Sequence, residues 1–155
     1  MSTGPKIKLK DCPEIRNEIS NLYESTSQVI LAKWAILCAK HVYQFMNEEN
    51  IDLTEIEEGF KIDELWQNGK ATAHEVRQAG FRIHAVARQC KTDLAKNAIR
   101  TAGQAVGVGH MREHAMVCSD YAIKVTELAF PEGRNKIKEE RTWQLNELKK
   151  IKTSP

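Results

Sequence analysis

The placement of proline most strongly constrains what this chain can fold into. Prolines occur only at positions 5, 13, 131 and 155, so residues 14–130 contain no residue that forbids a helix. No useful stretch shows the alternation of apolar and polar residues that is typical of a strand. The sequence therefore predicts an all-α fold. We expect a flexible N-terminal segment of residues 1–12, followed by a single-domain bundle of about six helices over residues 13–152.

Apolar periodicity and capping residues set the expected helix limits. Helices are expected over residues 14–23, 28–48, 55–67, 73–89 and 132–150, and from 93 to 129 with a break or kink near residues 107–110. The break is expected because three glycines, at 103, 107 and 109, each lower helix stability by about 1 kcal/mol relative to alanine. Thr72 and Glu75 have the spacing of a capping box. The helix over 28–48 is the most apolar and is predicted to be central.

The charge balance argues against a nucleic-acid partner. The 155 residues contain 23 lysines and arginines and 21 aspartates and glutamates, a formal net charge of +2. Basic residues gather in the last helix, but glutamates alternate with them, so this helix, Arg141 included, is predicted to be solvated and rich in ion pairs. The chain has no glycine-rich phosphate loop. We therefore expect neither nucleic-acid binding nor nucleotide chemistry.

The apolar stretches do not fit a membrane or secreted protein. The longest, residues 29–46, contains Lys33, Lys40 and His41, whereas a membrane span needs about 20 apolar residues. The N-terminal segment has no apolar run behind its lysines, unlike a secretory signal. The four cysteines are far apart and fall mostly within apolar helical patterns. We expect a cytoplasmic protein with reduced cysteines, no membrane contact and no cofactor.

One segment matches a catalytic zinc motif. Residues His110-Met111-Arg112-Glu113-His114 have the H-x-x-E-H pattern, in which two histidines hold zinc and the glutamate acts as base. However, a third ligand, such as His84 or Cys90, would have to come from another helix. On a helical wheel, Glu113 also falls on the polar side, away from the histidines. Three interpretations stay open: a structural histidine pair, a partner or small-ligand pocket near residues 107–110, or a zinc site in a metal-dependent hydrolase. No catalytic residue is assigned.

Neighbouring residues are further candidates for binding. Arg100 and Gln104 lie one helical turn apart, opposite a stripe of small residues, where they could hold an anion, order a loop or be solvated. Solvation is the simplest of these interpretations. Tyr121 follows the zinc-like motif and lies on the helix over 111–129. Together with His110 and His114, these residues form the candidate set for a partner or ligand.

Three large apolar residues lie away from the apolar stripe of their own helices. Met116 and Ile123 fall on the polar side of the helix over 111–129, which hints at a second packing surface or a homo-oligomer interface. Trp143 lies off the apolar stripe of the last helix. It is predicted to cover another helix or to form part of a contact surface.

The segment over residues 98–122 resembles a family of small helical bacterial proteins. From Ala98 to Ala115 it reads Ala-Ile-Arg-Thr-Ala-Gly-Gln-Ala-Val-Gly-Val-Gly-His-Met-Arg-Glu-His-Ala, and Tyr121-Ala122 follows. Leu31–Ala39, Trp66–Gly69 and Arg141–Gln144 look like further elements of this family. The resemblance thus spans about residues 31–145. The family is that of the Imm-five-like immunity proteins of polymorphic toxin systems.

The resemblance implies an all-helical protein that binds and neutralises a cognate toxin, and it does not imply catalysis. We therefore expect a protein-binding module without catalytic activity. Arg100, Gln104, His110 and His114 occupy positions that match the family pattern, without assigned roles. The two alternatives from the residues themselves are a metal-dependent hydrolase and a small-ligand-binding helical domain. Metal analysis and a toxin-protection assay distinguish these classes.

Overall fold

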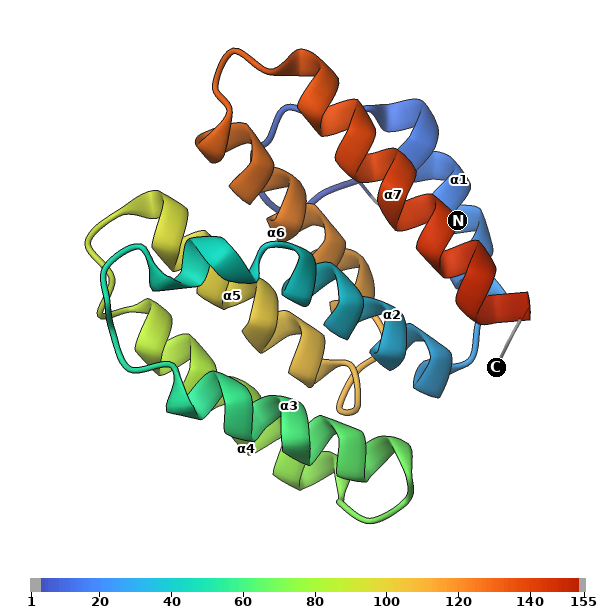
Figure 1. Cartoon of the computed structure of the whole chain (residues 1–155). Helices are drawn as coiled ribbons and strands as arrows, with labels where there is room; N and C mark the ends of the chain where they lie inside the picture. The colour runs from blue at the N-terminus through green and yellow to red at the C-terminus, as the bar shows by residue number, and fades with distance from the viewer. Residues whose placement is uncertain (1–3, 154–155) are drawn as a thin grey trace.

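The computed structural model describes residues 4–153 and contains seven α-helices and one short 3-10 helix, with no strand among these residues (Figure 1). The elements are α1 (Pro13–Glu24), α2 (Gln28–His41), η1 (Tyr43–Asn47), α3 (Thr54–Gln67), α4 (Ala73–Ala87), α5 (Asp93–Gly107), α6 (His114–Ala129) and α7 (Arg134–Thr153). The all-α prediction is confirmed. A seventh helix arises because the expected kink near residues 107–110 is a complete break between α5 and α6.

Local signals explain several of the helix ends. Pro13 occupies the first position of α1, where its missing N–H is not needed. The predicted capping box is formed, since Thr72 accepts from the Glu75 backbone and Glu75 accepts from the Thr72 backbone. Gly69 follows α3 with a φ of 73°, a left-handed conformation that glycine adopts without strain. These ends are therefore determined by adjacent residues.

α2 is shorter than predicted. The expected helix over 28–48 ends at His41, and the 3-10 helix η1 follows after Val42. No proline or glycine marks this end in the sequence. In the fold, the His41 ring stacks on Trp143 of α7, with 3.6 Å between ring centroids. The prediction was wrong here because a contact with a distant helix, rather than a local breaker, accompanies the end of α2.

The helices fall into three groups along the molecule (Figure 1). α3 and α4 pack together at one end, α1 and α7 pack together at the other, and α2, α5 and α6 lie between them. α5 contacts α2, α3, α4, α6 and η1. Nine of its 15 residues are buried, so α5 shares the centre with α2. The position of α5 brings α4 and α6 to its two sides.

The break between α5 and α6 is tightly packed. α5 ends at Gly107, and α6 begins at His114 rather than at Met111 as predicted. A Cβ at Gly109 would lie 2.8 Å from Val76 and 2.9 Å from the Trp66 ring. Only glycine fits at this close approach, because real Cβ atoms do not come so near to their neighbours. α3 and α4 thereby fix the turn that leads into α6.

α6 is buried on more than one side. It packs against α5 and α2, and also against α7. Met116 and Ile123, which fall on its polar side by sequence, are 9% and 0% exposed. The second packing surface predicted for these residues therefore lies within the chain itself. Homo-oligomerisation stays a prediction.

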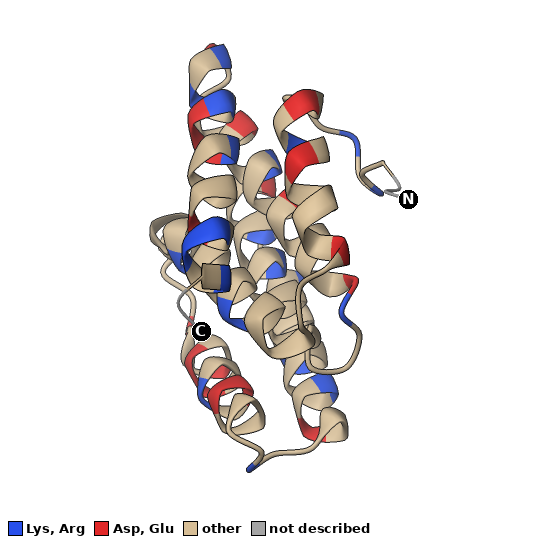
Figure 2. Cartoon of the chain, turned by 90° about the vertical axis from the view of Figure 1, so that its right-hand side faces the viewer, with Lys and Arg blue, Asp and Glu red and all other residues tan. Residues whose placement is uncertain are grey.

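The surface shows no separation into acidic and basic ends. Basic and acidic residues are interspersed along the outer helices (Figure 2). The four cysteines are free thiols, and Cys38, Cys90 and Cys118 are buried. Within residues 4–153, no helix is both long enough and apolar enough to cross a membrane. Residues 1–3 of the N-terminal segment that is predicted to be flexible lie outside the described residues.

Candidate functional site

Glycines bring α4 very close to α5. A Cβ at Gly80 of α4 would lie 3.3 Å from the backbone oxygen of Gly103 and 3.9 Å from the backbone nitrogen of Gly107. Gly103 and Gly107 are one helical turn apart, so they expose the backbone of α5 along one side. This stripe of small residues leaves room beside α5 for rings from the neighbouring helices.

The first ring is that of His84, on α4. A Cβ at Gly103 would lie only 2.6 Å from the His84 ring, so the imidazole lies directly on the backbone of α5. Burial lowers the pKa of His84 to about 4, and the positive charge of Arg100 adds to this effect. His84 is therefore neutral at physiological pH. From the sequence, His84 is a candidate only as a third zinc ligand, because nothing local to α4 indicates its position beside α5.

The second ring is that of His114, at the start of α6. Its ring lies 3.1 Å from a Cβ placed at Gly107. The Nδ1 atom of His114 is 2.6 Å from Oε1 of Gln104, which accepts its hydrogen bond. Burial also lowers the pKa of His114, with a further contribution from His110. Gln104 thus orients the ring and is not simply solvated.

The structure brings four of the five predicted binding residues together. Gln104 and His114 are hydrogen-bonded, and the exposed His110 ring lies 6.1 Å from the His114 ring, centroid to centroid. Arg100 precedes Gln104 by one turn of α5 and is near enough to His84 to affect its pKa. Tyr121 is half-buried, two turns further along α6. Its part in the same site stays a prediction.

The zinc motif does not have the geometry that its chemistry needs. His110 lies in the turn before α6, so it is not one helical turn from His114 on a common helix. Nδ1 of His114 is engaged by Gln104. Among residues 4–153, no group of three or more histidine, cysteine, aspartate or glutamate side chains is placed to hold a metal ion. These residues do not fit a hydrolytic zinc site, which needs three protein ligands.

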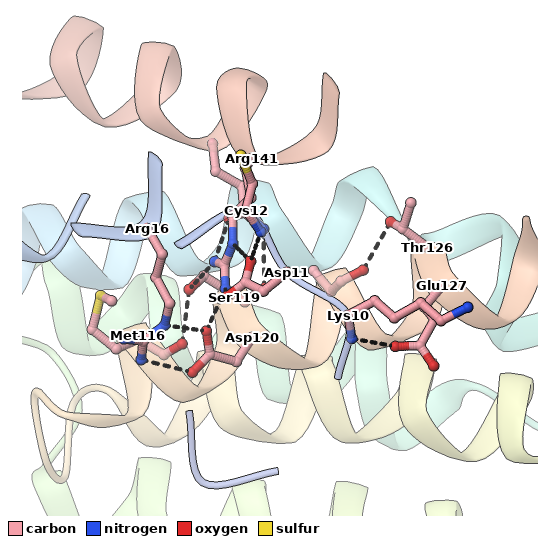
Figure 3. Close-up of polar contacts among 12 residues, drawn as sticks. Lys10, Asp11, Cys12, Arg16, Met116, Ser119, Asp120, Thr126, Glu127 and Arg141 are labelled. Carbon is pink, nitrogen blue, oxygen red and sulfur yellow. Dashed lines mark hydrogen bonds and ion pairs between the residues drawn. The ribbon is translucent and has the colours of Figure 1, made fainter. Parts of the chain in front are cut away.

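A buried ionic network on the other side of α6 was missed by the sequence analysis (Figure 3). Asp120 is 2% exposed and accepts from two arginines. Arg16 of α1 donates through Nε at 2.9 Å and Nη2 at 3.0 Å, and Arg141 of α7 donates through Nη2 at 2.7 Å. A carboxylate in this position is stable only because it is paired on both oxygens. On a helical wheel, Asp120 falls on the same polar side of α6 as Glu113, which is why its burial is not evident from the sequence.

Arg141 extends the network to the N-terminal segment. Its prediction as a solvated residue was wrong: it is 0% exposed. It binds both oxygens of Asp11, at 2.7 and 3.0 Å, and also donates to Ser119 and Gln144. Burial opposes the charge of Asp11, but the bond to Arg141 outweighs it and lowers the pKa of Asp11. These bonds hold α1, α7 and residue 11 against α6.

The residues on α4, α5 and α6 form a cluster of hydrogen-bonding groups. It offers two neutral imidazoles, an amide and a guanidinium, all able to form hydrogen bonds. Two cysteines of the core, Cys38 and Cys118, are fully buried, and burial raises the pKa of both thiols, so they remain protonated. Neither thiol is therefore a nucleophile that this site could use.

Comparison with protein families identifies one match. Residues 21–151 match the family described as "Imm-5 like putative immunity protein". The chain belongs to this family. Comparisons with curated proteins and with solved structures give no match. In this Imm-5 like protein, the segment over residues 98–122 runs from α5 through the break into α6, and it therefore contains most of the site described above.

Proposed function

We propose that the protein is an immunity protein that binds a cognate toxin and blocks it by forming a complex, without catalysis. Membership of the Imm-5 like family over residues 21–151 carries this proposal. The site supports it, because its residues form a set of hydrogen-bonding groups without a nucleophile or a three-ligand metal centre among residues 4–153. Such a protein acts in the bacterial cytoplasm, where it protects the cell that makes the toxin.

The surface proposed to bind the toxin is the α4–α5 face. We define it by eight residues: Arg77, Phe81, His84, Arg88, Arg100, Gln104, His110 and His114. The four residues from α4 and its C-terminal end are spaced by four, three and four positions, so they follow one side of the helix. Gln104 and the glycine stripe place the residues of α5 and α6 beside them.

The chemistry of the α4–α5 face fits an acidic partner. Arg77, Arg88 and Arg100 form no ion pair with a carboxylate in the described part of the chain. Phe81 is 50% exposed, and the guanidinium of Arg77 lies 4.7 Å from its ring centroid. Arginine and exposed aromatic residues are enriched at protein interfaces, and a guanidinium binds a carboxylate through two hydrogen bonds.

Co-expression with the product of the neighbouring gene tests the proposal. We expect restored growth and a complex on co-purification, with about 800 Å² buried on each partner. If growth is not restored and no complex forms, the proposal is overturned. In an established complex, replacing Arg88 and Arg100 with glutamate should weaken binding at least about tenfold. The matched control is Lys149→Glu on α7, an exposed charge reversal away from the face, which should leave affinity unchanged.

A further inference from the structure

A second site lies at the other end of α6, where the ends of α2 and α6 meet η1 and the start of α7. It is a hollow of about 350 Å³. Four of the residues that line it carry rings: His41, Phe45, Phe130 and Trp143. They come from four different elements or their ends, so the hollow exists only in the folded bundle. None of its lining residues belongs to the α4–α5 face.

The rings form two pairs. His41 and Trp143 stack with centroids 3.6 Å apart and planes 9° apart. Phe45 and Phe130 meet edge to face, with centroids 6.4 Å apart and planes 86° apart. Phe130 is 40% exposed, so part of its ring is accessible to a ligand. The faces of such rings carry partial negative charge and attract cations.

Two carboxylates add negative charge to the hollow. Glu139 and Glu140 both line it. The Glu140 side chain is 13% exposed and lies 2.7 Å from Nδ1 of His41. Burial raises the pKa of Glu140 in spite of this bond, which means that its negative charge is incompletely stabilised. A further positive group in the hollow would stabilise that charge.

An ammonium group of the chain itself already lies beside two of these residues. Nζ of Lys136 lies 5.3 Å from the centroid of the Phe130 ring and 3.8 Å from Oε2 of Glu139. The Lys136 side chain is 52% exposed, so it covers the hollow only at the edge. A primary ammonium on a flexible side chain is strongly hydrated. A free cation with more apolar surface would gain more binding free energy from contact with the rings.

We propose that this hollow binds a small organic ammonium cation between the rings of Phe45, Phe130 and Trp143. The cation takes the place of the Lys136 ammonium over Phe130, and Glu139 and Glu140 balance its charge. This site is independent of toxin binding. The quaternary ammonium of choline is a suitable probe, because it combines a positive charge with methyl groups that pack on aromatic rings.

Titration of the whole chain with choline chloride, followed by NMR, tests the proposal. We expect shifts of the Trp143 indole N–H and of amides in η1 and the first turns of α7, with a dissociation constant of about 1 mM. Sodium chloride at equal ionic strength and 3,3-dimethylbutan-1-ol, the uncharged analogue of choline, are the ligand controls. Equal shifts with the uncharged analogue, or none with choline, would overturn the proposal.

Two variants test the contributions of the rings and of the competing charge separately. Lys136→Met removes the competing ammonium and should tighten choline binding by about two- to fivefold, whereas Phe130→Leu should weaken it by a similar factor. Both residues are exposed, so these variants should fold. Lys149→Met on the same helix is the matched control and should change nothing. Unchanged affinity in the Lys136 and Phe130 variants would count decisively against the site, whatever the toxin assay shows.

Discussion

The carboxyl group of Asp63 should make the protein less stable as the pH rises to neutrality. Asp63 lies on α3 and is 0% exposed. Oδ2 accepts a hydrogen bond from Gln67 at 2.7 Å, but Oδ1 has no partner among the described residues. Burial raises its pKa from the ordinary value of 3.8 to about 7, against the lowering effect of Gln67. The folded state therefore prefers the protonated carboxyl.

The sign and size follow from proton linkage. Since the pKa is higher in the folded state, folding binds protons between pH 3.8 and about 7, and stability falls as the pH rises through this range. The full difference corresponds to about 4 kcal/mol, at 1.36 kcal/mol per pH unit. Because of Asp63, the free energy of unfolding of the wild-type protein should thus fall by about 3 kcal/mol between pH 5 and pH 8.5.

Asp63→Asn replaces the carboxyl with a neutral group of the same shape and should remove this loss. Urea unfolding of both proteins at pH 5 and pH 8.5 measures it. The free energy of unfolding of the variant minus that of the wild type should be about 3 kcal/mol larger at pH 8.5 than at pH 5. The pKa of His84, lowered to about 4, makes stability rise between pH 4 and 6.5, but it does so in both proteins and cancels.

Glu58→Gln is the matched control: Glu58 is an exposed acid on the same helix, whereas the neighbouring Glu64 itself helps to raise the pKa of Asp63. Its stability relative to wild type should change by less than about 0.5 kcal/mol between the two pH values. If the Asp63 variant has the same stability difference from wild type at both pH values, the pKa of Asp63 is not raised by folding. In that case Asp63 would be ionised and solvated throughout.

Three further predictions concern the packing of His84 on α5, the buried ion pairs of Asp120 and the zinc content of the protein. Gly103→Ala should cost about 1–3 kcal/mol and displace the His84 ring, since the added Cβ would lie 2.6 Å from it; an unchanged NMR titration of His84 would argue against this. Asp120→Asn should cost about 3–5 kcal/mol in urea unfolding, because it leaves two buried arginines short of their partner, and a loss below 1 kcal/mol would show that the network is not energetically coupled. Protein purified without chelators should contain substoichiometric zinc that is unaffected by replacing His110 and His114 with alanine; one zinc per chain that the double variant loses would revive the hydrolase interpretation.

The fold class could be predicted because its signals are local. The lack of proline over 14–130, the capping box at Thr72 and the glycine at 69 all act through neighbouring residues. The end of α2 could not be predicted in this way. The stack of His41 on Trp143 joins residues about a hundred positions apart, and no pattern near His41 records it.

The candidate site could be predicted only in part for the same reason. Gln104 and His114 lie in one segment and were recognised together. His84 enters the site only because α4 packs on Gly103, and Asp120 is buried only because arginines from α1 and α7 reach it. A helical wheel assumes one buried side, whereas α6 is enclosed by several helices. Charged residues on such a helix are misjudged unless the tertiary contacts are known.

The bond between Arg141 and Asp11 joins residues 130 positions apart in the chain. During synthesis, Asp11 leaves the ribosome long before Arg141 is made. The bonds that join α7 to the N-terminal segment can therefore form only late. The α4–α5 face is complete by residue 114, yet a chain that stops there lacks both Asp120 and Arg141. A nascent chain that has not finished α7 thus contains every residue of the proposed toxin-binding surface but lacks the bonds of Arg141 to Asp11 and Asp120. If the protein protects its cell as proposed, we expect protection to require the finished chain.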